Sequence, residues 1–114
     1  MENKYNYELV LCIVNNGFSE AVMDAAKKAG ARGGTVVNAR GTGSKEAEKF
    51  FGISVQEEKE TVLILVEAEK KNAVLSALYD EVGLDSAGQG IAFSLPVDGV
   101  VGLTQAQPTT DAEA

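Results

Sequence analysis

Two short runs of the chain, Leu9–Val14 and Val62–Val66, are apolar at every position. Both are rich in β-branched and aliphatic residues, which is typical of β-strands. An antiparallel strand with one solvated face would alternate apolar and polar side chains, and neither run does so. We therefore expect both faces of these two strands to be buried.

Turn signals and periodicity divide the chain into six expected elements. The expected strands are 8–14, 35–40, 61–66 and 91–103, and the expected helices are 19–29, with Ser19 as its cap, and 72–82. The order βαββαβ predicts an α+β, ferredoxin-like domain, in which two helices cover one face of a four-stranded antiparallel sheet. The second face still needs a cover, and other copies of the chain are the simplest one, so a homo-oligomer is expected.

Composition limits the classes of function. The 114 residues, 45% of them hydrophobic, suffice for one domain, assigned to 1–103, and the polar tail 104–114 is expected to be disordered. The net charge of −7 argues against binding nucleic acid, which needs clustered cations. Because neither a signal peptide nor an apolar run of about 20 residues is recognisable, we expect a cytoplasmic protein without membrane insertion.

The chain offers few groups for catalysis. It contains no histidine, and its single cysteine, Cys12, lies in an apolar run where a thiol packs as a small hydrophobe. Since no nucleophile has an evident activating neighbour, the chain is not expected to be an enzyme. Function is expected to lie in recognition.

Two glycine pairs mark the ends of predicted strands. Gly41-Thr42-Gly43 closes the second strand and Gly88-Gln89-Gly90 opens the fourth. Paired glycines allow bare backbone to approach a ligand, although both pairs could simply form tight turns. Neither pair fits a dinucleotide-binding fingerprint, because the third glycine of that motif is missing. Neither fits a phosphate-binding P-loop, because the chain has no Gly-Lys pair.

Together with the element order and the long segment 41–60, these pairs resemble the P-II nitrogen-regulatory signalling family over residues 8–103. The resemblance implies trimers that bind adenine nucleotides in clefts between subunits and use a long loop, the T-loop, to engage partner proteins. The T-loop would be residues 41–60. The nucleotide-binding residues that it implies are Thr35, Gly41, Thr42, Gly43, Lys45, Leu65, Gly88, Gln89 and Gly90.

The chain departs from the family where phosphate is bound. Ile91 stands in place of a phosphate-binding lysine, and two expected arginines fall near Gly102 and Thr104. With fewer cations to compensate charge, ADP or AMP is a more plausible ligand than ATP. Lys45, with Arg40 and Lys49 nearby, either replaces some of this charge or belongs to a solvated loop face.

The loop also carries apolar residues. Phe50, Phe51 and Ile53 lie among charged residues, where they form either a docking patch for a partner or a cover on the subunit edge. The resemblance implies a transporter or a metabolic enzyme as the partner. The alternative is a divalent-cation-binding or tolerance trimer of the same architecture, for which only carboxylates such as Glu57, Glu58 and Glu60 remain as ligands.

Overall fold

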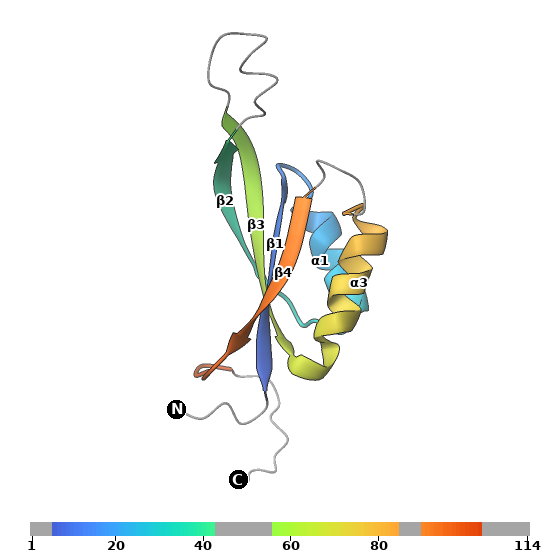
Figure 1. The fold of residues 1–114 in the computed structure, drawn as a ribbon, viewed down its shortest axis with the longest axis vertical. Helices are drawn as coiled ribbons and strands as arrows, with labels where there is room; N and C mark the ends of the chain where they lie inside the picture. Colours follow the sequence, from blue (N-terminus) through green and yellow to red (C-terminus); the bar gives the residue numbers. More distant parts are fainter. Residues whose placement is uncertain (1–5, 43–55, 85–89, 104–114) are drawn as a thin grey trace.

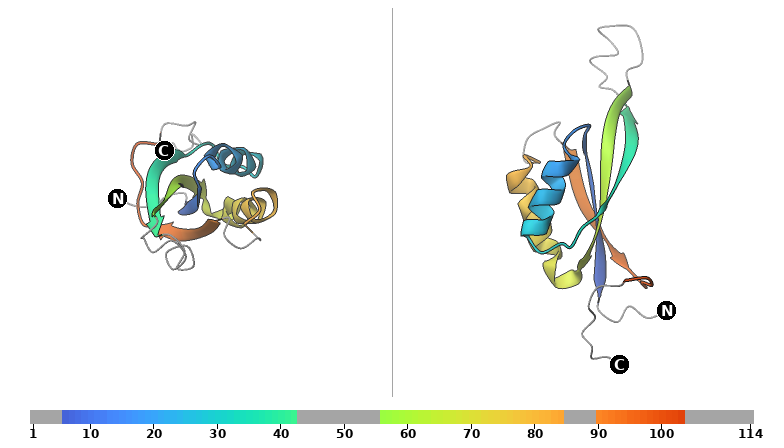
Figure 2. Two further views of the ribbon diagram at one scale, coloured as in Figure 1. Left: turned by 90° about the horizontal axis from the view of Figure 1, so that it is seen from above. Right: turned by 180° about the vertical axis from the view of Figure 1, so that it is seen from behind.

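The structure, a computed structural model, describes residues 6–42, 56–84 and 90–103. Its elements are β1 (Tyr7–Asn15), α1 (Ser19–Lys28), β2 (Thr35–Thr42), β3 (Gln56–Glu67), the short 3₁₀ helix η1 (Ala68–Lys70), α3 (Lys71–Glu81) and β4 (Gly90–Val97). The four strands form one antiparallel sheet in the order β2-β3-β1-β4. Both helices lie on the same face of that sheet (Figures 1 and 2). The predicted α+β, ferredoxin-like fold is confirmed.

The core lies between the helices and the inner face of the sheet. Alternate residues of the two central strands point into it, and they meet the apolar sides of α1 and α3. The largest fully buried side chains are Ile64, Leu78, Val10, Val14, Val22, Val62, Val74 and Cys12. The glycines expected to end the helices, Gly30 and Gly83, have φ of +115° and +85°, the left-handed conformation of helix ends.

The opposite face of the sheet is apolar and is not covered by the described residues. Leu9, Leu11 and Ile13 of β1 are only half-buried there. On the edge strand β4, Ile91 and Phe93 keep exposed fractions of 56% and 38%. Both faces of the sheet are therefore apolar, and the burial of this second face by other copies of the chain remains a prediction.

The strands that flank the predicted T-loop are longer than expected. Gly41 pairs with Glu57 and Thr42 with Gln56, so β2 and β3 continue as a two-stranded ribbon above the sheet (Figure 1). The segment between them is reduced to residues 43–55, which lie outside the described residues. At the other end, β4 stops at Val97 instead of continuing to residue 103.

No helix in the described part of the chain is long and apolar enough to cross a membrane.

Candidate functional site

A cavity of about 590 Å³ lies at the end of the sheet where β3 leads into η1. Its walls are the connection Gly30–Gly33 after α1, the end of β3 at Leu65–Glu67, and Gly102–Leu103 after β4, with Tyr7 and Lys70 completing it. Leu65, one of the predicted nucleotide-binding residues, thus lines a cavity. Apolar side chains form much of the wall, as is usual for small-molecule sites.

The connection between α1 and β2, which forms one wall of this cavity, is held in place at both of its ends. Ala31 is buried, and its N–H donates to the carbonyl of Ala26 at 2.9 Å. At Gly34, a Cβ atom would lie 2.7 Å from the carbonyl oxygen of Leu63, so a glycine is needed for this close approach. Arg32 therefore projects from a short segment that is held at both ends.

Among the described residues that line the cavity, the charged ones are Arg32, Lys70 and Glu67. The Nζ atom of Lys70 lies 3.2 Å from Oε1 of Glu67, and the two charges neutralise each other. The stem of Lys70 passes so close to Gly30 that a Cβ there would lie 2.9 Å from Cδ of Lys70. The described wall of the cavity therefore has an excess of one positive charge, carried by Arg32.

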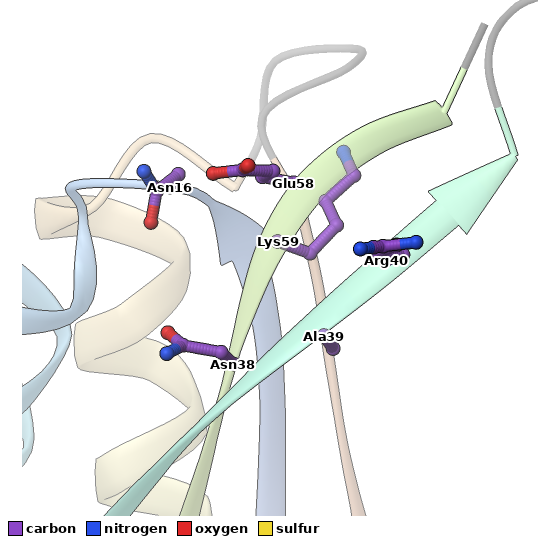
Figure 3. A pocket seen from close by; sticks show the side chains of 6 residues that line it. All are labelled: Asn16, Asn38, Ala39, Arg40, Glu58 and Lys59. Atoms are coloured by element: carbon purple, nitrogen blue, oxygen red, sulfur yellow. The ribbon is translucent and has the colours of Figure 1, made fainter.

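A second hollow, of about 570 Å³, lies at the base of the β2–β3 ribbon. Figure 3 shows Asn16, Asn38 and Glu58 on one side of the ribbon and the Lys59 amine directed away from them. Arg40 of β2 also lines this hollow. The lining is polar and mixed in charge, in contrast to the partly apolar cavity beside Leu65.

Lys59 fastens the ribbon to β1. Its Nζ atom donates to Oδ1 of Asn15 at 2.7 Å and lies 3.1 Å from Oε1 of Glu57. The stem of Lys59 runs beside Gly41, where a Cβ would lie 3.3 Å from Cε of Lys59. Because that contact is with a flexible side chain, the described residues do not require glycine at position 41.

Glu60 fastens the same ribbon to α1. Its Oε1 accepts the backbone N–H groups of Gly17 at 3.1 Å and Ser19 at 3.0 Å. The prediction that Ser19 caps the helix is wrong, since Phe18 is the cap residue and makes no side-chain cap hydrogen bond. The carboxylate of Glu60 supplies the acceptor instead, and a negative charge at this end suits the helix dipole.

Gly90 is required by the sheet itself. Its φ is +152°, and a Cβ would lie 2.5 Å from the carbonyl oxygen of Ile13 and 3.0 Å from Val14. Packing against β1 therefore accounts for this glycine, and whether the pair also forms a tight turn is not tested by the described residues. A role in binding a ligand through its backbone remains a prediction.

One chain does not bring the predicted nucleotide-binding residues together. Gly41 and Gly90 lie on the two edge strands, three strand spacings apart, and Gly41 is three residues further along the sheet than the row that contains Gly90, so the two are separated by about 18 Å. Leu65 is five residues along β3 from the row that contains Gly90, a distance of about 17 Å. Thr35 is exposed on β2 opposite Leu63, near the cavity but not in its wall.

The remaining predicted residues cannot be placed. Thr42 ends β2, but its side chain is not described. The other predicted residues that lie outside the described residues are Gly43, Lys45, Gly88 and Gln89 for the nucleotide and Phe50, Phe51 and Ile53 for a partner.

Neither Cys12 nor the carboxylates of β3 form a reactive or metal-binding centre in the described ranges. Cys12 is fully buried, and burial raises the pKa of its thiol to about 11. Glu57 pairs with Lys59, and Glu60 accepts from the turn before α1. No group of three or more potential metal ligands occurs among the described residues, so the divalent-cation alternative gains no support from them.

The family model of the nitrogen regulatory protein P-II matches residues 7–107. The chain belongs to the P-II family. P-II proteins are signalling regulators, and this membership supports a regulatory role for the chain. A search of curated proteins found no match.

Solved P-II structures share the fold. The GlnK–ATP complex of B. subtilis is 19% identical with a TM-score of 0.64, and the match covers 85% of this chain and 84% of that one. A protein from Thermus thermophilus, described as a putative PII-like signaling protein, is 22% identical with a TM-score of 0.62, covering 81% and 86%. CPII of Thiomonas intermedia, bound to ADP, AMP and bicarbonate, is 18% identical with a TM-score of 0.64, covering 87% and 98%.

The cavity of this P-II chain contains residues that sequence reasoning missed. Arg32, Glu67 and Lys70 were not among the predicted site residues, yet they line the cavity with Leu65. A local signal was available for Arg32, because it lies within Gly30–Gly34, where three of five residues are glycine. That density marks a close backbone approach as clearly as the two glycine pairs do.

Proposed function

We propose that the protein is a cytoplasmic P-II-type sensor that binds an adenine nucleotide in clefts between its subunits. Nucleotide binding changes the conformation of the segment 43–55 and thereby its affinity for a partner, a transporter or a metabolic enzyme. The protein acts by binding alone and catalyses no reaction.

The observation that carries this proposal is that the predicted nucleotide-binding residues lie in two separate places within one chain. The cavity beside Leu65 and the glycines at positions 41 and 90 are too far apart in one chain to contact one small ligand. The open apolar face of the sheet favours association with other copies, since large exposed apolar patches are typical of interfaces. A trimer, which the family resemblance implies, would bring the cavity of one subunit near the glycines of the next.

The ligand is proposed to be ADP or AMP in preference to ATP. The structural neighbours, one described as an ATP complex and another as bound to ADP and AMP, support an adenine nucleotide in general, and the preference rests on charge. The described wall of the cavity has only one positive charge in excess. Each additional phosphate brings negative charge that a partly apolar site must compensate.

A thermal-shift panel with ATP, ADP, AMP and cyclic nucleotides tests the binding. A ligand at one hundred times its Kd stabilises the folded protein by about 2.7 kcal/mol. For a domain of this size, we expect the Tm to rise by about 10 °C or more. If none of these nucleotides raises the Tm at millimolar concentration, nucleotide sensing is rejected.

The assembly is tested with two matched variants. Phe93→Glu places a charge on the open face of the sheet, whereas Tyr79→Glu places the same charge on α3, where Tyr79 is 55% exposed. We expect light scattering after gel filtration to give a trimer for the wild type and Tyr79→Glu, and a smaller species for Phe93→Glu. A monomeric wild type would contradict a site shared between subunits.

Partner control is tested on the segment 43–55. Replacing Phe50 and Phe51 by serine is expected to abolish capture of the partner while leaving the nucleotide-dependent Tm shift intact. Unchanged capture would assign the two phenylalanines to the alternative role of a cover.

A further inference from the structure

The cavity beside Leu65 has an apolar part and a charged rim. Leu65 and Leu103 contribute the apolar part, which suits a flat ring. Arg32, Glu67 and Lys70 contribute the charged groups. A ligand that satisfies both parts needs an apolar ring joined to an anionic group.

Arg32 and Lys70 differ in how available their charges are. Lys70 is engaged by Glu67 at 3.2 Å. Arg32 is exposed and makes no ion pair or hydrogen bond with any part of the chain that the structure describes. Its backbone is nevertheless held in place, because Ala31 is buried and Gly34 packs tightly against β3. A fixed backbone with an unengaged guanidinium lowers the entropic cost of binding an anion.

We propose that Arg32 binds the phosphate of the nucleotide and that Glu67 limits how much phosphate charge the cavity accepts. This inference rests on the proposed nucleotide-binding function and adds the residues that determine its selectivity. A guanidinium can hold two phosphate oxygens at once through parallel N–H···O bonds. Glu67 neutralises the other cation in the described wall, so a ligand with a single phosphate group matches the cavity best.

The first test compares two variants that lose the same charge. Arg32→Met removes the cation from the cavity, whereas Lys27→Met removes an exposed cation on α1 that does not line it. By calorimetry with AMP, we expect Arg32→Met to bind about ten-fold or more weakly, and Lys27→Met to stay within about two-fold of the wild type. Because Arg32 makes no hydrogen bond or ion pair with the described residues, the unliganded Tm of both variants should equal that of the wild type.

The second test changes selectivity in the opposite direction. Glu67→Gln keeps the size of the side chain but frees the charge of Lys70. We expect this variant to bind ATP more tightly relative to AMP, by about ten-fold in the ratio of the two Kd values. This gain of affinity cannot result from misfolding, so it also tests the site if Arg32→Met proves unstable.

The outcomes separate the inference from the proposed function. If the wild type binds none of the nucleotides, the proposed function fails, and this inference fails with it. If the wild type binds AMP, an equal affinity of Arg32→Met overturns the role of Arg32. An unchanged ATP-to-AMP ratio in Glu67→Gln overturns the role of Glu67.

Discussion

The link between Glu60 and the start of α1 gives the sharpest stability prediction. Glu60→Ala removes the acceptor for the N–H groups of Gly17 and Ser19. A hydrogen bond to a charged group contributes about 1.5–3 kcal/mol when well buried, and loss of a helix cap costs about 0.5–2 kcal/mol. Since the Gly17 bond is exposed and the Ser19 bond is only part-buried, we expect Glu60→Ala to lower the free energy of unfolding by about 1–2 kcal/mol.

A graded pair of variants separates the hydrogen bonds from the charge. Glu60→Gln retains an oxygen acceptor and loses only the interaction of the carboxylate with the helix dipole, worth about 0.3–1 kcal/mol. Glu58→Ala is the matched control, because Glu58 is two residues earlier on the same face of β3 and its backbone carbonyl, not its side chain, accepts a bond from Asn16 at 3.3 Å. Its side-chain truncation leaves that bond in place.

The assay is urea unfolding followed by circular dichroism, at one protein concentration because an oligomer's stability depends on it. We expect the midpoints to fall in the order Glu58→Ala, Glu60→Gln, Glu60→Ala, with equal m values. If Glu60→Ala and Glu58→Ala unfold at the same urea concentration, Glu60 does not hold α1 and the reasoning is refuted.

Two further predictions concern the edge-strand glycines and the buried thiol. Gly90→Ala is expected to lower the free energy of unfolding by about 2 kcal/mol or more even without ligand, because its Cβ would meet the carbonyl of Ile13. Gly41→Ala is expected to lower it by less than about 1 kcal/mol, and equal losses of stability in urea unfolding would contradict this difference. Burial raises the pKa of the Cys12 thiol to about 11, so the folded protein keeps this proton up to that pH. The thiol of the unfolded chain loses its proton above its ordinary pKa of 9.0. The free energy of unfolding should therefore fall as the pH rises between these two values. The slope should approach 1.4 kcal/mol per pH unit and be absent from this interval in Cys12→Ala, and equal slopes in the two proteins would assign the loss to other groups.

The fold was predictable because its main signals are local. The uninterrupted apolar runs identified β1 and the lower half of β3, and the glycines at positions 30 and 83 identified where the helices end. The order of these elements leaves few topologies for a chain of this length.

The ribbon and the helix cap were not predictable in the same way. Residues 56–60 are charged or polar at every position, so no period of two marks them as a strand, and their structure comes from pairing with β2. The acceptor at the start of α1 comes from Glu60, 41 residues away from Ser19, where no local motif points to it.

The sequence pointed to Leu65 through the family resemblance; this residue lines a cavity, and its role in binding a nucleotide stays a prediction. The sequence could not show that Arg32, Glu67 and Lys70 share that cavity, because they come from separate elements. For Gly90, sequence alone could not distinguish backbone exposed to a ligand from backbone pressed against β1, and the contact with Ile13 accounts for it.

The edge strand β2 has a consequence for how the protein must be handled. Its neighbouring residues Val36 and Val37 are 43% and 48% exposed on opposite faces, and neither lysine nor proline interrupts Thr35–Thr42. Arg40 is the one charged residue of this strand, and edge strands with exposed apolar side chains and little charge add strands from other molecules and seed aggregation. In the proposed oligomer, a separated subunit would therefore be vulnerable to precipitation, and dilution or mutations that weaken assembly should reduce the yield of recoverable protein.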